Sequence, residues 1–194
     1  MNYINVIRKE ITDYFDPKSL IKNSEEIHKS PTRNYSIKTV SYIQNKADTN
    51  WDVTKVEVFD NKKDERIFEF FSNHGELFFN WFRKESIDYL VCAEDIYGGQ
   101  TVIDLTNNKM ESYSPNEDGF IATEFYLSPN GEKLAIIGCF WACPFIIKIY
   151  DFTNPLKLPF QEIKEIDLNN NTIEIEGWLD NERIITNQGK IITI

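Results

Sequence analysis

The residues of this chain whose types could support chemistry are mainly carboxylates in turn-like segments. Glu94 and Asp95 form one adjacent pair, and Glu117 and Asp118 form another. Paired carboxylates can hydrolyse glycosidic bonds or hold Ca²⁺. Carboxylates are common in the turns of any acidic chain, so we favour a solvated surface role for them. A hydrolase of sugars or esters that uses these carboxylates is the alternative.

The thiols and imidazoles lack the spacing of a metal or catalytic site. Cys139 and Cys143 form a C-x-x-x-C pair, which would span about 13 Å in an extended strand. Zinc sites usually pair thiols at two-residue spacing and add two further ligands, whereas the remaining candidates are Cys92, His28 and His74 at unrelated positions. No P-loop, G-x-S-x-G or H-E-x-x-H motif is present. We therefore expect reduced thiols, no metal, no cofactor and no catalysis.

The hydrophobic pattern of the chain changes near residue 35, from helical spacing to short apolar runs. Residues 1–34 begin with apolar side chains at helical spacing and continue as a polar stretch that ends in Ser30-Pro31. This pattern predicts an amphipathic helix followed by a connector. Residues 35–194 contain short runs of Ile, Val, Phe, Tyr and Thr between turn residues. Because such short connections cannot hold crossover helices, we predict an all-β, mainly antiparallel domain over 35–194 behind the helical segment 1–34.

A repeated segment indicates how these strands are grouped. The sequences at 56–61, 101–107 and 147–154 echo one another, and their residues Asp60, Asp104 and Asp151 recur at about 45-residue intervals, the period of four-stranded propeller blades. Each aspartate is expected to accept backbone N–H bonds in the turn that follows its strand. We predict three to four propeller-like blades. Either residues 1–34 complete the ring, or the ring stays open and the N-terminal helix or another subunit covers its edge.

The unit at residues 123–168 resembles a WD40 repeat. In that family a Ser-Pro-Asp-Gly-like turn precedes a strand that ends in Trp-Asp, and here the turn at 128–131 precedes Tyr150-Asp151. Ile103-Asp104 and Phe59-Asp60 are weaker echoes, and the Gly-His pair of the family is absent. The resemblance implies a scaffold for protein contacts and no activity. The segment 138–152 is also similar to uncharacterised microbial propeller-like proteins, which imply nothing about function.

Aromatic residues in equivalent connections are the most specific functional signal. In a four-stranded blade, the connection between the second and third strands lies on the same rim as the connection from the fourth strand to the next blade. Large aromatic side chains recur in the second-to-third connections, so we expect them to converge on one face, where Tyr and Trp favour recognition. The competing interpretation is that each packs over its own blade. The candidate partner-binding residues on this rim are Trp51, Tyr97, Trp141, Glu94, Asp95, Asp118 and His74.

Charge and hydropathy restrict the class of partner. The 194 residues include 21 Lys and Arg against 31 Asp and Glu, a net charge of −10. This balance argues against a nucleic-acid partner and against an anionic membrane surface. The longest uncharged apolar run, 134–147, is shorter than the roughly 18 residues that a membrane span needs. With no signal or transit pattern and few cysteines, we expect a cytoplasmic protein.

These observations favour a non-catalytic protein-interaction module. We expect a protein partner on the aromatic rim, bordered by acidic residues, and a basic partner would be recruited by charge, as in an antagonist of a basic protein. A self-associating structural subunit, a homodimer formed through an open sheet edge, is the other alternative.

Overall fold

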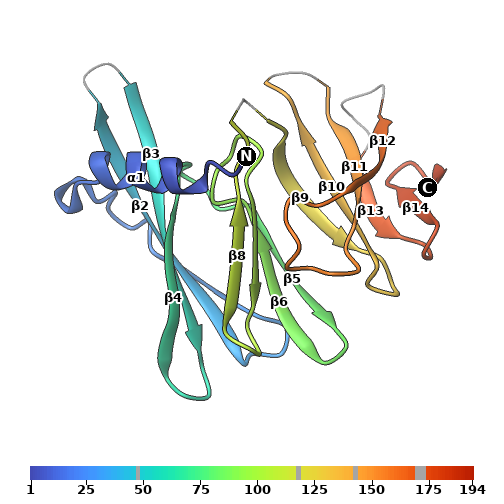
Figure 1. Cartoon of the computed structure of the whole chain (residues 1–194), viewed down its shortest axis with the longest axis horizontal. Coiled ribbons are helices and arrows are strands. Elements are labelled where there is room, and N and C mark those ends of the chain that lie inside the picture. The colour runs from blue at the N-terminus through green and yellow to red at the C-terminus, as the bar shows by residue number, and fades with distance from the viewer. Residues whose placement is uncertain (47–48, 117–118, 142–143, 169–173) are drawn as a thin grey trace.

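A computed structural model describes residues 1–46, 49–116, 119–141, 144–168 and 174–194. Its strands form four antiparallel sheets that follow one another along the chain and fan out from N- to C-terminus (Figure 1). Sheet A contains β1 (Glu26–Lys29), β2 (Tyr35–Lys46), β3 (Thr49–Asp60) and β4 (Glu65–Ser72); sheet B contains β5 (Phe79–Lys84), β6 (Ile87–Cys92), β7 (Gln100–Asp104) and β8 (Lys109–Tyr113). Sheet C contains β9 (Ile121–Leu127), β10 (Lys133–Cys139), β11 (Ile146–Asp151) and β12 (Glu162–Asp167); sheet D contains β13 (Ile175–Trp178), β14 (Arg183–Thr186) and β15 (Ile191–Thr193).

Neighbouring strands in each sheet are neighbours in sequence, which makes every sheet a simple meander. This arrangement confirms the prediction of propeller-like antiparallel units. The ring is open: the described apolar clusters join sheets A and B, B and C, and C and D. In Figure 1 sheets A and D lie at opposite ends of the fan.

Successive residues of the middle strands fill the space on both sides of their sheet. In β6, Leu90 belongs to the cluster shared with sheet A, whereas Val91 belongs to the cluster shared with sheet C. In β7, Ile103 belongs to the cluster shared with sheet A and Val102 to the cluster shared with sheet C. Because side chains alternate across a strand, a strand that is buried on both faces needs an apolar run instead of an alternating pattern. The apolar runs in the sequence therefore mark the middle strands of stacked sheets.

The face of sheet A that points away from sheet B is charged and partly covered. Ion pairs join Lys38 to Glu25 at 2.8 Å and Lys55 to Glu69 at 3.1 Å. These residues alternate with the core residues Ile37, Val56 and Phe70 on the same strands. Charged pairs of this kind suit a solvated surface. No further sheet packs there in the described part of the chain.

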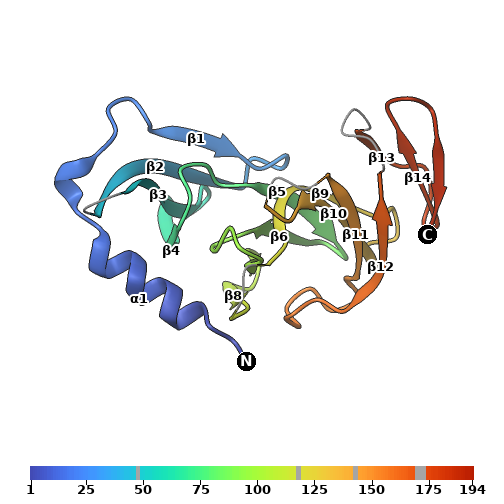
Figure 2. The ribbon, with the colours of Figure 1, turned by 90° about the horizontal axis from the view of Figure 1, so that it is seen from above.

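The N-terminal helix α1 (Ile4–Tyr14) covers the other part of that face. It buries Ile4 and Ile11, and the ring of Phe15 that follows it contacts Tyr42 of β2 and Phe71 of β4. Figure 2 shows the helix running along the outside of sheet A towards β8. A short 3-10 helix, η1 (Pro17–Ser19), then leads into β1. The expected amphipathic helix is confirmed, and it covers an open end of the fan.

The β structure begins at Glu26 and not at Tyr35. β1 pairs antiparallel with β2, with Glu26 opposite Thr39 and Lys29 opposite Ser36. It gives the first sheet a fourth strand from within residues 1–34. The expectation that the polar stretch before Tyr35 is only a connector is therefore wrong for residues 26–29. The last sheet does lack a fourth strand among the described residues.

The repeated aspartates have the expected local role. The Asp60 carboxylate accepts a hydrogen bond from the Lys62 N–H at 3.0 Å. Asp104 accepts from the Asn107 N–H at 2.9 Å and Asp151 from the Thr153 N–H at 2.8 Å. These bonds confirm that each aspartate caps the turn after the third strand of its sheet.

Candidate functional site

The connections that carry the predicted aromatic residues lie at one end of the fan. In Figure 1 the end of β2 and the start of β3, the β6–β7 connection, and the end of β10 and the start of β11 all lie at the upper end. The expectation that Trp51 lies in a connection is wrong, because Trp51 is paired within β3, opposite Gln44 of β2; its side chain is outside the described part of the structure. Tyr97 lies in the β6–β7 connection and Trp141 in the β10–β11 connection. The topology therefore places all three connections on a common rim.

Two of the three aromatic side chains meet. The rings of Tyr97 and Trp141, from sheets B and C, stack with centroids 5.0 Å apart and planes 23° from parallel. Trp141 is 55% exposed. Its backbone φ of 31° is unfavourable for a bulky side chain, at a cost on the order of 1 kcal/mol. The strained backbone of Trp141 thus holds the indole against Tyr97 while leaving much of it open to solvent.

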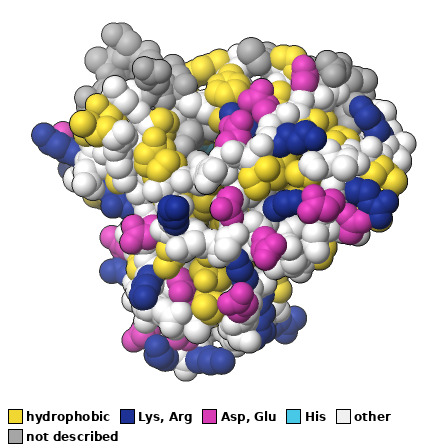
Figure 3. Space-filling view, turned by 45° about the vertical axis from the view of Figure 1, so that its right-hand side comes forward, with side chains coloured by type: hydrophobic (Ala, Val, Ile, Leu, Met, Phe, Trp, Pro, Cys, Tyr) yellow, Lys and Arg dark blue, Asp and Glu magenta, His cyan; other side chains and the backbone are white. Residues whose placement is uncertain are grey.

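Further rings extend this contact into a patch. Phe120 and Phe140 pack at 5.6 Å, and Phe120 follows Gly119, whose N–H donates to the Tyr97 carbonyl at 3.2 Å. We call Tyr97, Phe120, Phe140 and Trp141 the aromatic rim patch. Phe140 is 39% exposed and Phe120 is buried, so the patch has an exposed surface and a buried base. Figure 3 shows exposed hydrophobic side chains between acidic and basic ones on the face that carries sheets C and D.

A cation lies beneath the patch. The Lys148 Nζ is 5.5 Å from the Phe120 ring centroid and 5.3 Å from that of Phe140, within the range of a cation–π contact. Burial opposes its charge, but hydrogen bonds to Glu162 at 2.7 Å and Glu165 at 3.2 Å prevail and raise its pKa. Lys148 therefore stays charged and fixes the two phenyl rings.

A small pocket opens next to the patch between sheets B and C. Its volume is about 150 Å³, and its walls include Phe120, Tyr113, Pro115 and Phe160. Small-molecule sites usually measure about 300–1,000 Å³. A pocket of this size fits a single side chain better than a metabolite.

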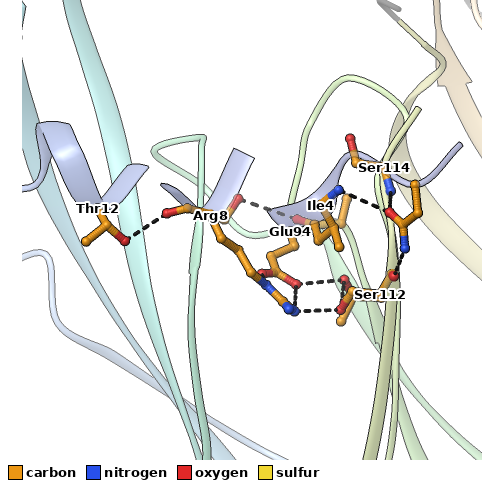
Figure 4. Close-up of polar contacts among 10 residues, drawn as sticks. Ile4, Arg8, Thr12, Glu94, Ser112 and Ser114 are labelled. Carbon is orange, nitrogen blue, oxygen red and sulfur yellow. Dashed lines mark hydrogen bonds and ion pairs between the residues drawn. The ribbon is translucent and has the colours of Figure 1, made fainter. Parts of the chain in front are cut away.

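The structure corrects the expected acidic border. Glu94 is completely buried and Asp95 is 2% exposed, so neither carboxylate presents an exposed acidic border. Figure 4 shows Glu94 held by Arg8 of α1, with Nε–Oε1 and Nη2–Oε2 distances of 2.5 and 2.9 Å. The Asp95 carboxylate accepts bonds from the Ser114 hydroxyl at 2.5 Å and from the Tyr97 N–H at 3.1 Å. Both carboxylates are fully hydrogen-bonded in the structure, and Asp95 positions the loop that carries Tyr97.

Removing the Arg8 guanidinium is expected to destabilise the fold. Hydrogen bonding to Glu94 raises the pKa of Arg8, and Arg8→Ala leaves the enclosed Glu94 carboxylate without its cation. Breaking a fully buried pair costs roughly 3–5 kcal/mol, and since the Arg8 side chain is 41% exposed we expect about 2 kcal/mol. Thermal unfolding should show a melting temperature lower by roughly 4–8 °C.

The matched control for Arg8→Ala is an exposed pair. Arg183 contacts Asp180 at 2.5 Å, with both side chains more than 40% exposed, and such pairs contribute about 0–1 kcal/mol. Arg183→Ala should therefore leave the melting temperature almost unchanged. An equal decrease in melting temperature for Arg8→Ala and Arg183→Ala would contradict the structural role of the Arg8–Glu94 pair.

The remaining candidates do not join the patch. The described contacts of His74 are with the Phe78 ring and the Glu76 backbone in its own β4–β5 connection. Asp118, like Glu117 and Cys143, lies outside the described residues, so the second carboxylate pair and the C-x-x-x-C pair stay predictions. Cys92 is fully enclosed, and burial raises its pKa well above the usual value.

Two properties of the described residues bear on other functions. No group of three or more His, Cys, Asp or Glu side chains is placed to hold a metal ion in the described ranges. Within the same ranges, no helix combines the length and the apolar character needed to cross a bilayer.

Sequence reasoning located part of this site. The rule that equivalent connections share a rim indicated Tyr97 and Trp141. It missed Phe140, Lys148 and Arg8. Phe140 and Trp141 are neighbours in sequence, so the pair of adjacent aromatic residues was the available signal. Nothing local indicated Arg8, whose partner Glu94 is 86 residues away.

The fold and the rim define a β-propeller type of architecture with an open ring. Among solved structures, the chain is similar to the β-propeller domain of Cps50 (Swd1) from Myceliophteria thermophila. The TM-score is 0.52 at 10% identity, over 87% of this chain and 53% of that one. At this identity the likeness shows the fold alone.

Among curated proteins, the chain is similar to an uncharacterised protein of Acanthamoeba polyphaga mimivirus. The two are 28% identical over 149 residues, which cover 76% of this chain and 58% of that protein. The chain thus spans between half and two thirds of the length of each of these two proteins. No family model matches it.

Proposed function

We propose that this protein is a non-catalytic interaction module that docks a protein partner on the aromatic rim patch. The observation that carries the proposal is the stack of Tyr97 on Trp141, which joins two sheets and leaves the indole 55% exposed. Tyr and Trp are enriched among the residues that dominate binding energy. The propeller-like fold supports the proposal, since its rims present loops from several blades on one surface.

The base of the patch suits an anchored side chain from a protein. Lys148 and Asp95 fix the rings from below, which lowers the entropy that ordering them on binding would cost. The adjacent 150 Å³ pocket matches the volume of a partner side chain. A basic partner is the finer part of this proposal. Its support is the net charge of −10 and the position of Glu162 and Glu165 beside Lys148. Self-association is a prediction that no observation favours.

Trp141→Ala is expected to remove binding without unfolding the protein. Truncating a binding hot spot costs about 2 kcal/mol or more, a loss of affinity of roughly 30-fold or greater. The exposed turn position should change the melting temperature by less than about 3 °C. Partner retention by immobilised protein, quantified by mass spectrometry, and thermal unfolding should be measured for the same preparations.

Ile163→Ala provides the control for this comparison. Ile163 lies on β12 and is 50% exposed. Its substitution by Ala therefore removes a similarly exposed apolar side chain outside the patch. A partner lost with Trp141→Ala and retained with Ile163→Ala supports the proposal. Retention of the same proteins by all three preparations would contradict it, and a large loss of stability in Trp141→Ala would assign Trp141 to the core.

A further inference from the structure

A second hollow lies between sheets A and B, apart from the rim patch. The core-facing side of sheet A is apolar where Ile37 and Val56 pack against sheet B. Towards the upper end of the same strands it becomes polar, with Thr39, Ser41 and Thr54. These hydroxyl-bearing side chains line a hollow of about 330 Å³. This volume lies within the range of ligand sites.

The floor of the hollow contains hydroxyl groups with unused hydrogen-bonding capacity. Thr39 is 8% exposed, lines the hollow, and has no hydrogen-bond partner among the described residues. No enclosed polar side-chain atom in the described part lacks a partner, so the Thr39 hydroxyl must be reached through the hollow. Thr54 is 1% exposed, and its hydroxyl makes a long 3.4 Å contact with Ser41. The Thr39 oxygen is open to the hollow, and the Thr54 oxygen, although almost completely enclosed, keeps acceptor capacity beside it.

The walls are acidic and partly aromatic. Glu26 and Glu76 line the hollow, and the lining residues include no Lys or Arg. The Glu26 carboxylate lies 3.1 Å from the Nε2 of His28, which also lines the hollow, so Glu76 is the carboxylate of the two without a cationic neighbour in the lining. The nearby Lys38 and Lys55 belong to the opposite face of sheet A, where they pair with other carboxylates. Phe79, whose ring contacts the His28 ring at 5.2 Å, forms an apolar wall together with Leu77. The hollow thus combines negative charge, hydroxyl acceptors and an apolar surface.

We propose that this hollow binds a primary ammonium group on an aliphatic stem. An ammonium group offers three donors and no acceptor, which matches the Thr39 and Thr54 oxygens together with a carboxylate. The stem packs on Leu77 and Phe79, as lysine stems do on apolar surfaces. A free alkylamine and the lysine side chain of a protein share this chemistry. The proposal goes beyond the rim patch and does not depend on it.

The test is a calorimetric and NMR titration of the full chain with three probes. Nα-acetyl-lysine methylamide carries the ammonium group in a peptide-like frame, its Nε-acetylated form is the neutral counterpart, and n-pentylamine is the free amine. We expect saturable binding of the charged lysine probe and none of the neutral one. Binding of n-pentylamine as well indicates a site for free amines, whereas binding of the lysine probe alone indicates a protein side chain; both support the proposal.

Two substitutions in the hollow and one control complete the test. Thr39→Val keeps the shape and removes the hydroxyl, and Glu76→Gln removes an exposed charge. Each should weaken binding about tenfold. Glu111→Gln, at an exposed position of β8, should leave binding unchanged. If Thr39→Val does not fold, Glu76→Gln decides. The proposal is overturned if neither amine binds, if the neutral probe binds equally well, or if Glu76→Gln and Glu111→Gln behave alike.

Discussion

Gly138→Ala is expected to destabilise the protein by about 3 kcal/mol, at the upper end of the usual cost of overpacking. Gly138 lies at the irregularity in β10 where the pairing with β9 shifts by one residue. A Cβ atom there would be 2.0 Å from the Ile121 carbonyl oxygen and 2.7 Å from the Phe120 ring. Because the first contact is with backbone, no side-chain rotation relieves it. The melting temperature should fall by roughly 6–12 °C.

Gly177→Ala distinguishes the cost of a steric clash of the added Cβ atom from the cost of an unfavourable backbone conformation. A Cβ atom at Gly177 meets nothing within 4 Å, but the residue has a φ of 142°. Its substitution should therefore cost on the order of 1 kcal/mol through the backbone alone. In thermal unfolding, the melting temperature of Gly138→Ala should be well below that of Gly177→Ala. The reverse order would mean that β9 and β10 are not as close as described.

Phe152→Ala is expected to cost about 4 kcal/mol, as large truncations in a packed core do. Phe152 is completely buried and contacts the rings of Phe82 in sheet B and Phe160 in the β11–β12 connection of sheet C. It belongs to the apolar cluster that joins these two sheets. Its removal should therefore weaken the contact between sheets B and C as well as lower the melting temperature by roughly 10 °C.

Phe145→Ala is the matched control. Phe145 directly precedes β11 and Phe152 directly follows it, but Phe145 is 38% exposed. It should change the free energy of unfolding by less than about 1 kcal/mol. Chemical denaturation followed by tryptophan fluorescence and by circular dichroism checks both variants. Equal losses would show that Phe152 is not a core residue, and they would argue against the stacking of sheets B and C.

The sequence predicts the middle strands well because burial on both faces gives a clear physical signal. Runs such as 133–140 and 145–152 match β10 and β11 closely, since most of their apolar residues enter one of two cores. The repeated aspartates were equally predictable. A carboxylate that caps its own turn acts within three residues, so its role is visible in a short segment.

The parts that sequence could not predict depend on contacts between distant segments. β1 contains Glu26, Ile27, His28 and Lys29, and three of these four residues are exposed. A strand at the inner edge of the fan has no core to specify an apolar pattern, so it resembles a polar connector. Glu94 and Asp95 resemble surface carboxylates for a related reason. Their burial depends on Arg8 and Ser114, which are remote in sequence.

The candidate site was predictable as a location. Equivalence of the connections placed Tyr97 and Trp141 on one rim, and the two rings do stack. The repeat also places the loop that joins sheets B and C, and with it Phe120, on this rim, but the packing of Phe120 against Phe140 could not be read from the sequence. That this patch binds a partner stays a proposal.

Site-specific photo-crosslinking tests that proposal most directly. p-Benzoyl-phenylalanine would replace Phe140 in one preparation and Ile163 in a second, since both side chains are partly exposed but only Phe140 lies in the patch, where Trp141 stays intact. After illumination in cells that produce the protein, we expect a discrete protein adduct from position 140, diminished by excess unlabelled wild-type protein, and no such adduct from position 163. No adduct at position 140, or the same adducts from both positions, would contradict docking on the aromatic rim patch.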